Sequence, residues 1–77
     1  MSRGEVQSVL LDRGSFPTRR MANDYIRHHN FRLVFRGKGA HLTEKYWRYR
    51  QRDPGRYARL RTRTVEPGVK HVIGYRA

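Results

Sequence analysis

The chain has 77 residues, with 18 lysines and arginines against 6 acidic residues, which gives a formal net charge of +12 at pH 7. A chain this short forms at most one small domain with a marginal core, and the absence of cysteine excludes disulfides and thiolate metal sites. Most of the basic residues are arginine, which binds phosphate and carboxylate groups through two parallel hydrogen bonds.

The whole chain, 1–77, is predicted to be a single domain with a loosely ordered start at 1–4. Nine aromatic residues argue against general disorder, because disordered segments are poor in aromatics. The sequence shows no signal-peptide pattern and no apolar run of about 20 residues that would span a bilayer. We therefore expect a soluble protein of the cell interior, with no membrane partner.

The first half of the chain predicts one strand and one helix. Residues 6–11 form an apolar strand pattern that ends before Gly14. Thr18 is typical of a helix N-cap, and Asn30 of a helix end. Between them, four side chains recur at the spacing of one helix face: Ala22, Tyr25, Ile26 and His29.

The second half predicts strands. Alternating patterns occupy the four segments 31–36, 45–51, 59–65 and 69–75. Turn residues separate them at 37–39 and 53–55 and at Pro67-Gly68, a pair that suits the centre of a type II turn. The fold class predicted is α+β, with one helix packed on one face of a mostly antiparallel sheet of four to five strands.

The alternation also predicts what each face of the sheet carries, since successive strand residues point to opposite sides. The apolar set is expected beneath the helix: Phe31, Leu33, Phe35, Trp47, Tyr49, Leu60, Ile73 and Tyr75. The basic set would then share the uncovered face: Arg32, Arg36, Arg48, Arg50, Arg52, Arg59, Arg61, Arg63 and Lys70.

Like charges on neighbouring strands repel, so a face of one sign favours an anionic partner. The hypothesis is a nucleic-acid-binding protein that contacts the phosphate backbone of DNA or RNA. Its predicted contacts are Arg48, Arg50, Arg52, Arg59, Arg61 and Arg63, with Arg56 and Lys38 from turns and Tyr46 as a stacking platform. The simpler alternative is a charged face that only keeps the sheet soluble, but such faces usually mix both signs of charge, so the pattern of one sign, mostly arginine, favours polyanion binding.

A protein-interaction module or inhibitor that docks on an acidic surface of a host protein or enzyme is the alternative, and a minor virion component is a third. A marginal core with exposed strand edges also allows a homodimer. Enzymatic activity, metal binding and cofactors are not expected. The six acids are scattered, and the adjacent His28 and His29 point about 100° apart on a helix.

Several segments together resemble a family of small basic proteins of unassigned function in tailed phages and large DNA viruses. They are the opening 6–11, the Thr18-capped helix, Tyr49–Pro54, Leu60–Thr62 and Gly68–Tyr75. The resemblance covers most of the chain, although arginine replaces much of the expected lysine. It implies a viral origin and names no active site.

Overall fold

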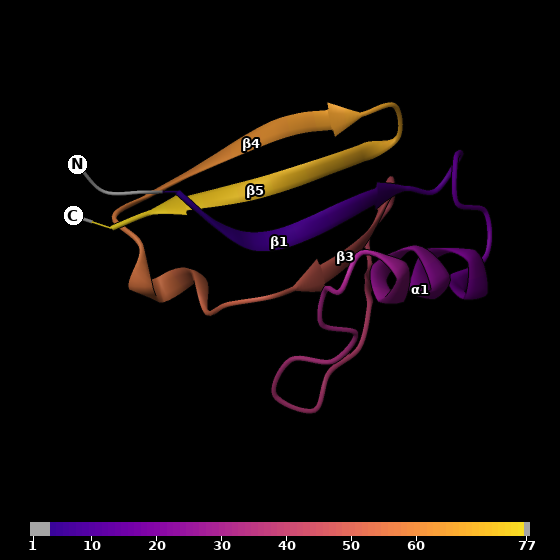
Figure 1. Cartoon of the computed structure of the whole chain (residues 1–77), viewed down its shortest axis with the longest axis horizontal. Coiled ribbons are helices and arrows are strands. Elements are labelled where there is room, and N and C mark those ends of the chain that lie inside the picture. The colour runs from indigo at the N-terminus through magenta and orange to yellow at the C-terminus, as the bar shows by residue number, and fades with distance from the viewer. Residues whose placement is uncertain (1–3, 77) are drawn as a thin grey trace.

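The computed structural model describes residues 4–76, which form one α-helix beside a five-stranded sheet (Figure 1). In chain order the elements are β1 (Glu5–Asp12), α1 (Arg19–His28), β2 (His41–Leu42), β3 (Tyr46–Arg50), a 3-10 turn (Pro54–Arg56), β4 (Arg59–Glu66) and β5 (Val69–Tyr75). The strand order is β2-β3-β1-β5-β4, and every neighbouring pair is antiparallel. The α+β prediction is confirmed.

The predicted loose start falls largely on residues 1–3, which lie outside the described residues. Within 4–76, no helix combines the length and the apolar character needed to cross a membrane.

The helix begins and ends where its capping residues predict. Thr18 is extended, and its hydroxyl accepts a hydrogen bond from the backbone N–H of Met21 at 3.2 Å. Asn30 has a positive φ of 60°, a conformation that stops a helix and that asparagine tolerates. Ala22 and Ile26 are fully buried against the sheet, as their spacing predicts.

The β4–β5 hairpin also follows its local sequence. Pro67-Gly68 links the two strands, and Gly68 has a φ of 80°. A type II turn requires a positive φ at its second central residue, and glycine adopts it without strain. The predicted turn agrees with this backbone.

The core lies between α1 and the three inner strands. Its buried side chains are Val9, Leu11, Ala22, Ile26, Trp47, Tyr49 and Val69. Tyr49 is 1% exposed, and its hydroxyl donates to the Asn23 side-chain oxygen at 2.6 Å, which ties β3 to the helix. Burial raises the pKa of Tyr49 to about 12.

Replacing Tyr49 with phenylalanine is expected to lower the free energy of unfolding by about 1 kcal/mol at neutral pH, because one buried hydrogen bond is lost. The folded pKa is raised, so the stability that Tyr49 adds is complete below pH 10 and falls as the pH rises toward 12. The advantage of the wild type over Tyr49→Phe should therefore shrink across that range. Urea unfolding in neutral and alkaline buffers measures it, and a constant difference would contradict the assignment.

The predicted strand at 31–36 is wrong, because this segment is a loop. Gln51 holds the loop with its side chain: its Oε1 accepts from the Arg32 N–H at 2.7 Å, and its Nε2 donates to the Arg32 carbonyl at 3.0 Å. Arg36 and Gly37 both have positive φ, so the chain turns back there and Phe35 forms a single bridge with Lys38. The two-residue strand β2 takes the edge position beside β3 instead.

Phe31 and Leu33 nevertheless pack against the core as half-buried side chains, whereas Phe35 does not join them. The core role predicted for Phe35 is therefore corrected.

Candidate functional site

The arginines of β3 and β4 point to opposite faces of the sheet, which contradicts the single basic face predicted. Directly opposed residues of antiparallel strands share a face. One row across the sheet comprises Tyr49, Val9, His71 and Arg63, on the face that α1 covers. The adjacent row comprises Arg48, Leu10, Lys70 and Thr64, on the open face.

The reason is the position of β4 in the sheet. β4 is an edge strand that lies away from α1 (Figure 1). Both of its faces are exposed, and Leu60 is 43% exposed instead of buried. Without a buried side, its alternation does not tell which residues face the helix. Arg61 lies opposite Ile73, and Arg59 opposite Tyr75, on the helix-covered side.

The largest concentration of cations lies at the other edge, beside β3. Two adjoining hollows of about 630 and 560 Å³ lie between the 32–41 loop, β3 and the 51–56 turn. They share Phe35, Arg36 and Asp53 as walls, and we call them together the basic cleft. Its lysine and arginine residues are Arg32, Arg36, Lys38, Arg48, Arg50, Arg52 and Arg56. These seven cations face one carboxylate among the lining residues, that of Asp53, which pairs with Arg36. Arg52 also pairs with Glu5 outside the cleft, so five of the seven cations have no carboxylate partner among residues 4–76.

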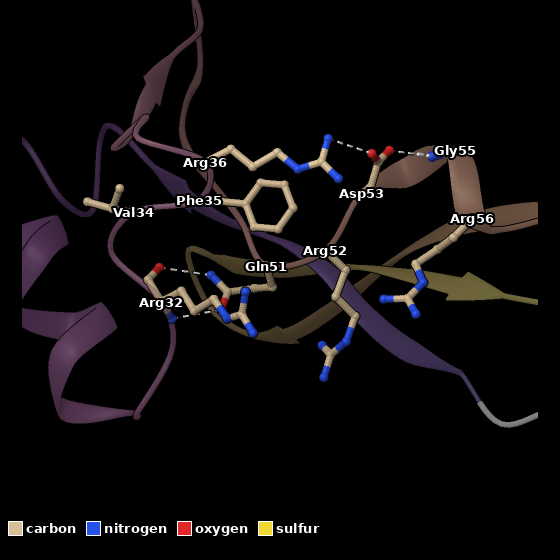
Figure 2. A pocket seen from close by; sticks show the side chains of 9 residues that line it. All are labelled: Arg32, Val34, Phe35, Arg36, Gln51, Arg52, Asp53, Gly55 and Arg56. Atoms are coloured by element: carbon tan, nitrogen blue, oxygen red, sulfur yellow. Dashed lines mark hydrogen bonds and ion pairs between the residues drawn. The ribbon is translucent and has the colours of Figure 1, made fainter.

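Asp53 fastens the two sides of the basic cleft together. One of its oxygens accepts the Gly55 N–H at 2.9 Å, which starts the 3-10 turn, and the other lies 3.0 Å from the Arg36 guanidinium (Figure 2). The Gly55 hydrogen bond, followed by the charges of Arg36 and Arg50, holds the pKa of Asp53 below its ordinary value. The carboxylate thus stays ionised and keeps the loop turn against the 53–56 segment.

Arg48 is the most constrained cation on the open face. It is half-buried and donates from Nε to the Ser8 hydroxyl at 3.3 Å. Burial first, and then the charge of Arg50, lower its pKa below the ordinary value. A nearby anion would act in the opposite direction and raise the pKa of Arg48.

Arg52 is half-buried and is held by the backbone. Its guanidinium donates to the Val6 carbonyl at 2.8 Å and lies 3.6 Å from Glu5. Glu5 also contacts Arg76 at 3.2 Å, so this carboxylate is shared between two cations. The arrangement positions Arg52 on the wall of the cleft without fully neutralising it.

A second basic surface, which we call the edge row, comprises Arg59, Arg61 and Arg63 on β4. A shallow hollow of about 240 Å³ separates Arg61 and Arg63 from Ile73 and Tyr75. The Arg59 guanidinium carbon lies 5.1 Å from the centre of the Tyr75 ring. The three arginines form no salt bridge among the described residues.

The structure thus divides the nine predicted site residues into three groups. Five line the basic cleft: Lys38, Arg48, Arg50, Arg52 and Arg56. Three form the edge row, and Tyr46 lies apart on the open face. The Lys70 ammonium donates to the Tyr46 hydroxyl at 2.9 Å, so this ring already has a cationic neighbour and lies outside the cleft.

Sequence reasoning missed several lining residues as parts of the site. Arg32 and Arg36 join the cleft from the loop, His41 joins it from the start of β2, and Phe35 forms part of its wall. The sequence signal that could have found them is the Gly37-Lys38-Gly39 turn. A turn brings the residues before and after it close together, and here those residues include several cations. Within residues 4–76, no three histidine or acidic side chains are grouped to hold a metal ion.

Comparison with known proteins finds no family model, no curated protein and no solved structure that matches this chain. The resemblance to small basic phage and viral proteins accordingly stays a prediction.

Proposed function

We propose that this protein binds nucleic acid and contacts its phosphate backbone through the basic cleft. The observation that carries the proposal is the charge of the two adjoining hollows, whose walls carry seven cations and one carboxylate. Arginine guanidinium groups bind phosphate oxygens in pairs, and a row of them matches a chain of regularly spaced phosphates.

The edge row has a supporting role in this proposal. It lies on the far edge of the sheet from the cleft, with the strands β1 and β5 between β3 and β4. Its charges add to the long-range attraction that raises the rate of encounter with a polyanion. The cleft, where cations from three segments converge, supplies the contacts that hold the ligand.

Binding to duplex DNA, single-stranded DNA and RNA at several salt concentrations tests the proposal. If about six phosphates are engaged, the logarithm of the binding constant should fall against the logarithm of salt with a slope near −5 on duplex and near −4 on single strands. Fluorescence anisotropy with labelled oligonucleotides measures both slopes. A flat salt response would refute backbone binding.

An acidic protein surface is the competing partner, and one further measurement separates the two. A pull-down from nuclease-treated extract should lose its retained material if nucleic acid is the ligand. A stoichiometric protein that persists after nuclease, together with weak oligonucleotide binding, would favour the protein-interaction alternative.

A further inference from the structure

Phe35 is a large aromatic side chain that the core does not use. The half-buried hydrophobic residues that pack against the core include Phe31 and Leu33 but not Phe35. Instead, Phe35 lines both hollows of the basic cleft. Figure 2 shows its ring projecting into the first hollow between Arg36 and Arg52.

The backbone around Phe35 is held on both sides of the turn. Its N–H donates to the Lys38 carbonyl at 2.8 Å, and the Lys38 N–H donates to the Phe35 carbonyl at 3.1 Å. The next residue, Arg36, pairs with Asp53 and lies with its guanidinium carbon 5.3 Å from the Phe35 ring centre. The backbone that carries the ring is therefore held before any ligand arrives, which reduces the entropy lost on binding.

Cations lie on both sides of this ring. Arg32, Arg52 and Arg56 line the first hollow, and Lys38, Arg48 and Arg50 line the second. A single nucleic-acid strand alternates bases with phosphates, and an aromatic ring flanked by cations matches that alternation. In a duplex the bases are stacked inside the helix, so their faces are not available to a side chain.

We propose that Phe35 is a stacking platform for an unpaired base, and that the phosphates on either side of that base lie in the two hollows. This inference rests on the proposed function and narrows it to single-stranded nucleic acid. Stacking on aromatic rings tolerates every base, so the site is expected to show little sequence preference.

The test compares two oligonucleotides of equal length, oligothymidylate and the same backbone without bases. The full-length wild type should bind oligothymidylate roughly tenfold more tightly, because only that probe can stack on Phe35. Phe35→Leu should bind both probes equally and keep the salt slope of the wild type. Phe35→Trp, which retains a stacking surface, should preserve the preference.

Tyr75→Leu is the matched control, because it removes an aromatic ring next to an arginine in the edge row. It should leave the tenfold preference unchanged. Equal binding of both probes by the wild type would overturn the stacking platform while leaving backbone binding intact. Absence of any salt-dependent binding would instead overturn the proposed function. Loss of the preference in Tyr75→Leu but not in Phe35→Leu would place the stacking site elsewhere and also overturn the inference.

Discussion

Replacing Arg50 and Arg56 together with glutamine is expected to weaken oligonucleotide binding roughly thirtyfold, if each phosphate contact contributes about 1 kcal/mol. The two residues lie on opposite sides of Asp53, one in each hollow of the basic cleft. Both side chains are exposed, so the double variant should fold as the wild type does. Anisotropy titrations with a labelled single strand at moderate salt measure the change.

The matched control is the double variant Arg61→Gln and Arg63→Gln in the edge row. It removes the same two charges, so the long-range attraction falls equally in both variants. The control should weaken binding less than about threefold, and only the cleft variant should reduce the salt slope by about 1.4 on a single strand. Equal losses in the two variants would mean that total charge, and not the cleft, determines binding.

The elements that sequence patterns predicted well are those fixed by local interactions. The helix is set by Thr18 and Asn30, two residues that act within one turn of the chain. The β4–β5 hairpin is set by Pro67-Gly68 in the same way. In β3, Trp47 and Tyr49 are buried while Arg48 and Arg50 are on the other face, because this strand has one buried side.

The elements that sequence patterns predicted poorly depend on distant partners. Nothing near residues 31–36 reveals that the side chain of Gln51 holds the Arg32 backbone and prevents strand pairing. In β4, the face of each arginine follows from its pairing with β5. The alternation of residue types in β4 cannot show which face each arginine occupies, because both faces of this strand are exposed.

The candidate site shows the same division. Four of the predicted cations gather because β3 and the following turn are continuous in sequence, whereas Lys38 and the other loop cations reach the cleft because Gln51 holds the Arg32 backbone and Arg36 pairs with Asp53. Arg36 and Asp53 belong to two separate segments, and no repeating pattern in the sequence predicts that these segments lie side by side. A cluster of arginines in a sequence therefore does not by itself show which of them share a surface.

Replacing Trp47 with alanine is expected to unfold the protein or to lower its melting temperature by at least about 12 °C. Loss of a buried tryptophan costs about 3 to 5 kcal/mol, and a domain of this size has a total stability of roughly 4 to 12 kcal/mol. In small domains each kcal/mol shifts the melting temperature by about 4 to 8 °C. Trp47 is 7% exposed and belongs to the core between sheet and helix.

Trp47→Phe separates packing from hydrogen bonding at this position. The indole N–H donates to the Phe16 carbonyl at 2.7 Å, which anchors the segment that leads from β1 into α1. Phenylalanine keeps an aromatic ring in the core but leaves that carbonyl without its partner, so we expect a loss of about 1 to 3 kcal/mol. Thermal unfolding followed by circular dichroism ranks the variants. If Trp47→Ala melted within a few degrees of the wild type, the helix would not depend on this contact.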